Sequence, residues 1–217
     1  MRSNLRLAFA AGVFLLTYDE MGTGSSATSA VRFDSNLNLL TAPFSLNPSP
    51  LTGLADNGTG FYAVWNRQEP DYSVHVAGSR ISTAGVKLDG NGVNLSGTKQ
   101  PYAYAAQAGA WDGLNWRVTW GEYATAYVAR VTSAGALLDA GSVAVPGVQT
   151  GPTAGNSAGG LQVIWTIYTN FSYDVSSAAI STANVAGPTR TLSLGAPQQV
   201  LPDVATSGNG YMAVYRS

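Results

Sequence analysis

The stretch Pro50-Leu-Thr-Gly-Leu-Ala-Asp-Asn-Gly-Thr-Gly-Phe-Tyr-Ala-Val-Trp65 decides the fold, because its pattern recurs along the chain. Proline opens the pattern again at positions 101, 152 and 202, at intervals of 51, 51 and 50 residues. A fixed period of this size predicts a solenoid, a propeller or another repeat array. We therefore expect one continuous repeat domain over residues 1–217.

Each repeat contains four extended segments in one order. Small residues follow the proline, and a turn such as Asp56-Asn-Gly-Thr-Gly60 then predicts a hairpin. The second segment is apolar and ends on an aromatic residue, while the third ends in sequences such as Arg80-Ile-Ser82. A tight turn leads to the fourth segment. Four short antiparallel strands in about fifty residues are typical of a propeller blade.

The repeats predict an all-β fold, a β-propeller of four-stranded antiparallel blades. Four complete repeats cover about residues 5–46, 51–96, 102–146 and 152–195, and a half repeat covers residues 202–217. We favour a five-bladed arrangement whose last blade has two strands. A fragment of a longer propeller and subunits that complete one another remain alternatives, because proteins usually cover an unpaired edge strand.

The amino-terminal residues imitate a signal peptide, with a positive end before an apolar run. Val13-Phe-Leu-Leu-Thr-Tyr18 nevertheless stands where Phe61-Tyr-Ala-Val-Trp65 stands in the next repeat, so we predict a strand of the first blade. No stretch reaches the ~18 apolar residues that span a membrane. We expect no membrane insertion.

Composition excludes several classes of partner and chemistry. The 11 basic and 12 acidic residues give a net charge of -1 without a basic run, so nucleic acid is not an expected partner. There is no cysteine, and the single histidine, His75, cannot form a multi-histidine site. No G-x-S-x-G or phosphate-binding motif occurs. We therefore predict no metal, no cofactor and no catalytic residue.

The repeat resembles a known group of Trp-centred β-propeller repeats of about fifty residues, found in many secreted and surface-exposed bacterial proteins. The resemblance rests on Pro202-Asp-Val-Ala205, Gly210-Tyr-Met-Ala-Val-Tyr215 and Arg130-Val-Thr-Ser-Ala-Gly-Ala-Leu-Leu-Asp139. It covers nearly the whole chain and implies the propeller fold and an extracellular or cell-surface location. It implies little about activity, because such repeats serve as scaffolds.

Recurring side chains are expected to be structural. We predict that each recurring arginine pairs with an acid that follows the second segment of its own repeat: Arg32 with Glu20, Arg80 with Glu69, and Arg130 with Glu122. The aromatic residues at the ends of the second segments are expected to form the core between blades: Tyr18, Trp65, Trp120, Trp165 and Tyr215.

Loops that differ between repeats are the better places for a binding site, because binding residues concentrate on loops of a rigid scaffold. The segment Ala108-Gly-Ala-Trp-Asp-Gly-Leu-Asn115 is the largest departure from the repeat. Aromatic rings beside amides and carboxylates suit a sugar. The predicted ligand-binding residues are Trp111, Asp112, Asn115, Tyr72, Tyr123 and Tyr173.

These features favour a non-enzymatic binding or adhesion propeller that recognises a glycan or a protein through its loop face. Two alternatives remain. A glycoside-cleaving propeller would need two carboxylates across a central cleft, and Asp203 on a first segment, with Asp56 and Asp112 just after one, are the acids nearest the axis. A structural module would self-assemble as a homo-oligomer through the unpaired edge of the half repeat.

Overall fold

The computed structural model describes residues 2–21, 26–98, 106–122, 125–146, 153–157, 160–169, 172–193, 200–207 and 210–216. Every helix or strand that occurs in these ranges is a β-strand. Within them, no helix is long and apolar enough to cross a membrane.

The strands form four antiparallel sheets of four strands and one sheet of two. The first sheet contains β1 (Arg2–Ala10), β2 (Val13–Met21), β3 (Ser26–Asp34) and β4 (Leu39–Asn47). The second contains β5 (Leu51–Asp56), β6 (Phe61–Gln68), β7 (Val74–Ile81) and β8 (Val93–Asn94). The third contains β9 (Ala106–Trp111), β10 (Asn115–Glu122), β11 (Thr125–Thr132) and β12 (Leu137–Pro146). The fourth contains β13 (Thr153–Ser157), β14 (Gly160–Thr169), β15 (Ser172–Ile180) and β16 (Arg190–Ser193), and β17 (Val200–Ser207) pairs with β18 (Gly210–Arg216).

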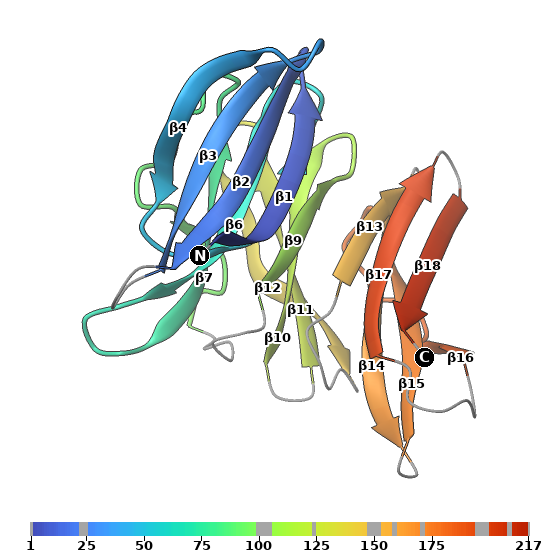
Figure 1. The fold of residues 1–217 in the computed structure, drawn as a ribbon. Helices are drawn as coiled ribbons and strands as arrows, with labels where there is room; N and C mark the ends of the chain where they lie inside the picture. Colours follow the sequence, from blue (N-terminus) through green and yellow to red (C-terminus); the bar gives the residue numbers. More distant parts are fainter. Residues whose placement is uncertain are drawn as a thin grey trace.

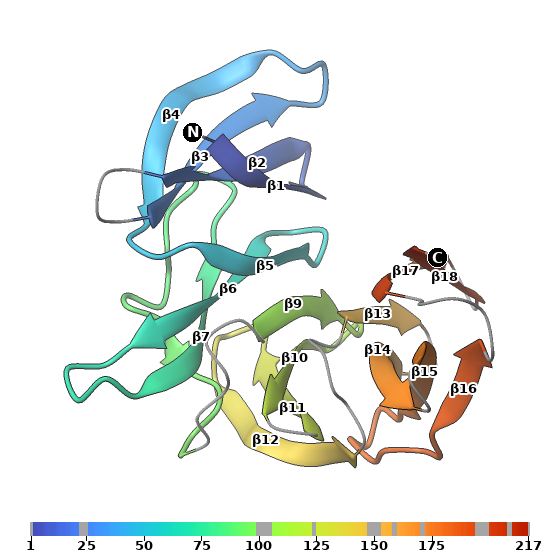
Figure 2. The ribbon, with the colours of Figure 1, turned by 60° about the horizontal axis from the view of Figure 1, so that its bottom comes forward.

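The sheets are the blades of a β-propeller and follow one another along an arc (Figure 1, Figure 2). The first strand of each blade lies on the inner side, and β1 contacts β5, β5 contacts β9, β9 contacts β13, and β13 contacts β17. We call the sheets blades 1 to 4 and the β17–β18 hairpin the half blade. The predicted all-β propeller of four-stranded antiparallel blades is confirmed, whereas the count of five blades stays a prediction.

The turn residues explain why each repeat folds into consecutive hairpins. Between β5 and β6, the Asn57 side chain accepts hydrogen bonds from the backbone N–H groups of Thr59 and Gly60, at 3.0 and 2.8 Å. Gly58 supplies the positive φ of 80° that this turn requires. The apolar amino-terminal stretch likewise forms a hairpin, β1–β2, with Phe9 opposite Phe14.

The core lies between blades, where one face of each blade packs against the opposite face of the next. Tyr62 and Val64 of blade 2, for example, pack with Trp116, Trp120 and Val131 of blade 3. Equivalent clusters join blade 1 to blade 2 and blade 3 to blade 4. The predicted aromatic core positions are buried at Tyr18, Trp65, Trp120 and Trp165, while the side chain of Tyr215 lies outside the described part.

The predicted acidic partners of Arg80 and Arg130 are wrong, whereas the pairing of Arg32 with Glu20 stays a prediction. Arg80 pairs with Asp89 at 2.6 Å and Arg130 pairs with Asp139 at 2.7 Å, so each partner lies just after the third-to-fourth turn rather than after the second strand. The Arg80 guanidinium also donates to the backbone C=O of Ser133 in blade 3, at 3.2 Å. A Cβ at position 135 would lie 2.8 Å from Nε of Arg80. Glycine at this position of the blade 3 turn therefore leaves room for the Arg80–Asp89 ion pair of blade 2.

Blade 3 is tied to blade 4 by a buried arginine that has no counterpart in the other repeats. The Arg117 side chain pairs with Asp112, and the two side chains are 0% and 4% exposed. Its two Nη groups donate to the carbonyl oxygens of Ser181 and Thr182 in blade 4, each at 3.0 Å. A buried ion pair with its remaining donors satisfied in this way fixes the position of the next blade.

We expect the substitution Arg117→Ala to lower the free energy of unfolding by about 3–5 kcal/mol, because it leaves the buried Asp112 carboxylate without its partner. Denaturation by urea, followed by tryptophan fluorescence, measures this loss.

The matched control is Arg67→Ala, which removes an ion pair with Glu69 whose side chains are 27% and 30% exposed. A solvated pair of this kind contributes at most about 1 kcal/mol. Equal losses in the two variants would contradict the inter-blade role of Arg117.

Candidate functional site

The second strands end, and the third strands begin, at one end of the propeller, which we call the loop end (Figure 1). The connection between β6 and β7 in blade 2 brings together five side chains that can bind or react: Arg67, Glu69, Asp71, Tyr72 and His75. We call these residues the blade 2 site. Tyr72 is 82% exposed, so its ring is available to a ligand.

Backbone hydrogen bonds give the loop a defined shape. The Glu69 N–H donates to the carbonyl of Ser73 at 2.8 Å, and the Tyr72 N–H donates to the carbonyl of Glu69 at 2.9 Å. Tyr72 has φ of +65°, which is uncommon for a residue with a large side chain. Strained positions of this kind occur at functional sites. The loop therefore carries an exposed aromatic ring within three residues of two carboxylates, Glu69 and Asp71.

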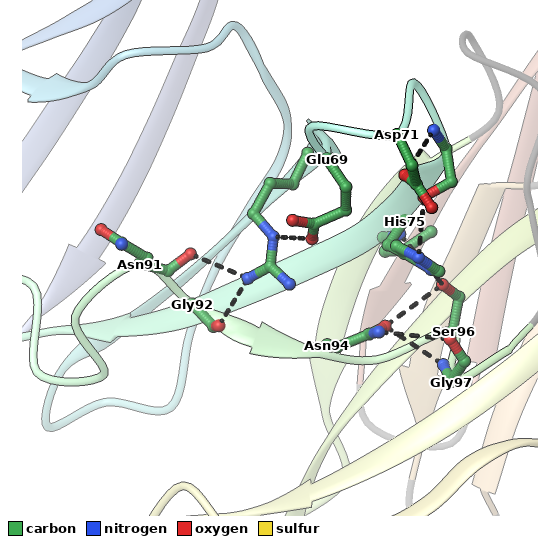
Figure 3. Close-up of polar contacts among 11 residues, drawn as sticks. Glu69, Asp71, His75, Asn91, Gly92, Asn94, Ser96 and Gly97 are labelled. Atoms are coloured by element: carbon green, nitrogen blue, oxygen red, sulfur yellow. Dashed lines mark hydrogen bonds and ion pairs between the residues drawn. The ribbon is translucent and has the colours of Figure 1, made fainter.

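Arg67 fixes the Glu69 carboxylate from one side. Its Nε donates to Oε1 of Glu69 at 2.7 Å, and its Nη1 donates to the backbone carbonyls of Asn91 and Gly92, at 3.3 and 3.0 Å (Figure 3). The guanidinium is thus oriented by main-chain groups of the third-to-fourth connection. The Glu69 carboxylate is thus held in one orientation by Arg67 and is still partly exposed to solvent.

A chain of hydrogen bonds links Asp71 to His75. The Ser73 hydroxyl donates to Oδ1 of Asp71 at 2.6 Å, and the His75 Nε2 lies 3.4 Å from the same hydroxyl oxygen (Figure 3). On the other side of the ring, Nδ1 of His75 lies 3.3 Å from the hydroxyl oxygen of Ser96. This hydroxyl donates to Oδ1 of Asn94 and accepts the Val76 N–H. His75 is therefore a partly buried strand residue, held by two serines.

The same contacts set the charge of Asp71. Hydrogen bonds from the hydroxyl and then the N–H of Ser73 lower the pKa of the Asp71 carboxyl, and the nearby His75 lowers it further. Asp71 is consequently ionised at neutral pH. No group of three or more histidine and acidic side chains that could hold a metal ion occurs in the described ranges.

Two other carboxylates of the described chain, those of Asp19 and Asp34, serve the fold. Asp19 is buried and accepts hydrogen bonds from the Thr28 hydroxyl at 2.7 Å and the Asn4 amide at 2.9 Å. Asp34 accepts the N–H groups of Asn36 and Asn38 in an outer turn. Glu69 and Asp71 differ from these acids because they lie in a loop that also carries an exposed aromatic ring, that of Tyr72.

The predicted ligand-binding residues do not form one site. Trp111, Asp112 and Asn115 lie together at the turn between β9 and β10, at the end opposite to the loop end. The Trp111 ring is partly buried and meets Trp116 edge to face, with ring centroids 5.0 Å apart. Asp112 accepts the N–H groups of Leu114 and Asn115 and pairs with Arg117. The described contacts of these three residues are thus within the protein.

Two of the predicted tyrosines, Tyr72 and Tyr173, lie at the loop end but in different blades. Tyr72 lies in blade 2, and Tyr173 lies in blade 4, partly buried and opposite Tyr168 in the β14–β15 hairpin. Tyr123 lies outside the described residues. Sequence reasoning named Tyr72 but not Glu69, Asp71 or Arg67 beside it. The signal that was present is the Asp71-Tyr-Ser73 pattern, which is typical of a turn closed by an aspartate side chain.

No protein-family model matches the sequence, and a search of curated proteins finds no significant match. Solved structures do match the fold. The catalytic domain of the GH62 α-L-arabinofuranosidase from Coprinopsis cinerea matches over 99% of this chain and 83% of its own, with 9% identity and a TM-score of 0.51. A putative glycoside hydrolase from Bacteroides ovatus matches over 87% of this chain and 71% of its own, with 10% identity and a TM-score of 0.51. A putative glycoside hydrolase from Parabacteroides distasonis matches over 87% and 72%, with 11% identity and a TM-score of 0.50.

These similarities support the propeller fold and correct the predicted function. The sequence favoured a non-enzymatic binding or adhesion propeller, but the similar structures are those of a glycoside-cleaving enzyme and of two putative ones. The glycoside-cleaving alternative agrees better with this finding, and the adhesion prediction is not retained.

The ion pair of Asp112 predicts a pH dependence of stability. Burial alone would raise the pKa of Asp112, but hydrogen bonds from Arg117, Asn115 and Leu114 outweigh it, so the pKa is lowered. A carboxylate whose pKa is lower in the folded than in the unfolded state stabilises the fold at pH values above the unfolded pKa of about 3.9. This contribution is lost as the pH falls through the folded-state pKa, because the carboxylate becomes protonated. We expect Asp112→Asn to be less stable than wild type at pH 7, with a gap that narrows below about pH 4. Urea denaturation of both proteins from pH 7 to pH 2.5 tests this, and a constant gap would contradict it.

Proposed function

We propose that this protein is a glycoside-cleaving enzyme that binds its glycan at the blade 2 site. The observation that carries the proposal is a single loop that holds two carboxylates of fixed direction, Glu69 and Asp71, together with the exposed Tyr72 ring. Glycoside cleavage needs a pair of carboxyl groups, one to protonate the leaving oxygen and one to act as nucleophile or as base toward water. The shared fold with glycoside hydrolases supports the proposal at the level of architecture alone.

The environments of the two acids suggest how they divide the work. Asp71 has a lowered pKa and is the ionised carboxylate of the pair. Glu69 is the second carboxyl group of the pair, and Arg67 sets its direction. Arg67 has two backbone carbonyl partners besides Glu69, so its position does not depend on Glu69 alone.

Tyr72 supplies the surface for the sugar. An exposed aromatic face packs against the apolar face of a sugar ring, while the carboxylates and Arg67 meet the hydroxyl groups. This arrangement binds neutral or weakly polar glycan surfaces without a cofactor.

We expect Asp71→Asn and Glu69→Gln each to lower kcat for glycoside hydrolysis by about 100-fold or more, because each removes one member of the acid pair. Asn keeps the acceptor oxygen for Ser73, so the loop is retained. Tyr72→Ala is expected to raise KM with little change in kcat. A panel of chromogenic aryl pyranosides and furanosides, followed by oligosaccharides, measures the rates.

Asp34→Asn is the matched control, since it neutralises a partly exposed aspartate of an outer turn outside the blade 2 site. It should leave kcat and KM unchanged. Hydrolysis that survives both Asp71→Asn and Glu69→Gln, or that is absent across the panel, would overturn the proposal.

The location and the repeat family are part of the same proposal. We propose an extracellular or cell-surface enzyme of bacterial origin, in keeping with the resemblance of its repeats to Trp-centred propeller repeats of secreted proteins. Glycans displayed outside the cell are substrates consistent with such a location. Cell fractionation with an antibody against the protein tests the location.

A further inference from the structure

His75 links the loop that carries Asp71 to the segment around β8. It is the single histidine of the chain, and in β7 it lies directly opposite Arg67 of β6. Each of its ring nitrogens faces a serine oxygen (Figure 3): Nε2 lies 3.4 Å from Oγ of Ser73, and Nδ1 lies 3.3 Å from Oγ of Ser96. A ring nitrogen that carries a proton donates such a hydrogen bond, and one without a proton accepts it. The directions of the two serine protons therefore decide which protonation state of the ring fits.

Ser73 directs its hydroxyl proton away from His75. The hydroxyl donates to Oδ1 of Asp71 at 2.6 Å. The pKa of Asp71 is lowered first by the hydrogen bonds from Ser73 and further by His75, so the carboxylate is ionised at neutral pH and can only accept hydrogen bonds. Because a hydroxyl group has one proton, the Ser73 oxygen offers His75 a lone pair.

Ser96 directs its proton away from the ring in the same manner. The Asn94 side chain donates from Nδ2 to the carbonyl of Gly97 at 3.2 Å and accepts the Gly97 N–H at Oδ1, at 3.1 Å, which fixes the orientation of this amide. The Ser96 hydroxyl donates to the same Oδ1 at 3.3 Å, and its oxygen accepts the Val76 N–H at 3.2 Å. Ser96 is buried, so these contacts are shielded from water. Its oxygen also offers His75 a lone pair.

A ring with two protons satisfies both contacts. Neutral histidine has one ring proton, so one of its nitrogens would place a lone pair against a serine lone pair. The imidazolium form of His75 donates from Nε2 to Ser73 and from Nδ1 to Ser96. Hydrogen bonds from a charged donor are also stronger than neutral ones. The hydrogen-bond network thus selects the protonated ring.

The charges that face His75 agree with this assignment. Arg67, opposite it on β6, carries a like charge, but its guanidinium is already paired with Glu69 and bonded to two backbone carbonyls. Asp71, in the connection between β6 and β7, carries the opposite charge. On the side of β8, the contact is with the neutral Ser96. Asp71 is therefore the charge that the imidazolium balances.

We propose that His75, in its imidazolium form, is a positioning residue of the blade 2 site that acts through Ser73 on Asp71. The ring holds the Ser73 oxygen, and the hydroxyl and N–H of Ser73 hold the carboxylate. Loss of the second ring proton removes one of the two ring contacts and loosens the carboxylate. The role of this carboxylate in glycoside cleavage rests on the proposed function, whereas its link to His75 does not.

The link has a defined pH range. An aspartate is ionised above about pH 4, and a histidine loses its second ring proton between about pH 5 and pH 8. The full chain of contacts from Ser96 to Asp71 is therefore present at about pH 5 and is lost as the pH rises toward 8. A purely structural histidine would not give the Asp71 carboxylate such a dependence.

Nuclear magnetic resonance of the full chain tests the link without a substrate. We expect the Asp71 carboxyl carbon to show two titration steps, its own at acid pH and a second one as the His75 ring nitrogens lose a proton. The Ser73 N–H donates to Oδ1 of Asp71 at 3.0 Å, so its exchange with water should be slower while His75 is protonated. We expect the exchange rate of Ser73, divided by that of a control amide, to rise about tenfold between pH 5 and pH 8.

The turn of Asp34 in blade 1 is the matched internal control. Asp34 also accepts backbone N–H groups at Oδ1, from Asn36 and Asn38 at 2.8 Å, and hydrogen bonds from Asn38 likewise lower its pKa. The Asn38 N–H therefore serves as the control amide. No contact with His75 is described for this turn, so the Asp34 carboxyl carbon should show one titration step, at acid pH.

Two variants separate the charge of the ring from the serine bridge. His75→Gln keeps a side-chain donor but has no charge at any pH, so the second step of Asp71 and the change in the exchange ratio should disappear. Ser73→Ala removes the bridging hydroxyl and keeps the N–H bond to Asp71, and should reduce the second step to about half or less. Circular dichroism shows whether both variants keep the fold.

The rate of hydrolysis supplies the readout for the positioning role. We expect kcat of the wild type to fall about fivefold more than that of His75→Gln between pH 5 and pH 8, because only the wild type loses a contact to the ring in this range. Equal pH profiles of kcat in the two proteins would overturn the positioning role.

Three results without substrate would also overturn the proposal: a single step for both Asp71 and Asp34, an exchange ratio that does not change with pH, or a second step that His75→Gln retains. Absence of hydrolysis, by contrast, would overturn the proposed function alone, because the carboxyl steps and the exchange ratio still show whether His75 holds Asp71.

Discussion

The contact between successive blades is the constraint on which the rest of the structure depends. A single four-stranded sheet cannot bury both of its apolar faces, and each blade here uses its neighbour to do so, as Tyr62 of blade 2 does against Trp116 of blade 3. Polar groups then fix the spacing, since Arg80 and Arg117 hold backbone carbonyls of the following blade. These contacts join blades that are neighbours in sequence. The stability of the propeller therefore depends on each blade and on its interface with the next blade, as in other repeat proteins.

The fold could be predicted from the sequence because its signals are repeated and local. The proline period, the Gly and Asn turns and the aromatic ends of the second strands each agree with the four-stranded blades that the structure contains. The arginine partners could not be predicted, because the choice between Glu69 and Asp89 for Arg80 depends on strand register across the third and fourth strands. Repeat spacing alone does not define that register.

The site was harder to predict than the fold for a related reason. The eight-residue departure at 108–115 seemed the best place for a ligand, but its Asp112 is occupied by Arg117. Arg117 in turn is held by carbonyl groups of blade 4, a contact that a linear pattern does not reveal. Tyr72 was identified from its loop, whereas the importance of Glu69 and Asp71 depends on which side chains hold their carboxylates. Such contacts become visible only when the loop conformation is known.

The brevity of β8 has an effect on the blade 2 site. Strand β12 of blade 3 has ten residues, but β8 has only two. Residues 90–92, which precede β8, therefore do not pair with β7. Main-chain carbonyls that a full strand would use within the sheet at Asn91 and Gly92 face the Arg67 guanidinium instead. A fourth strand lengthened toward its amino end would withdraw those acceptors and free Arg67 to turn away from Glu69. The orientation of Arg67 and Glu69 in the blade 2 site is thus a consequence of the short fourth strand on the outer edge of the same blade.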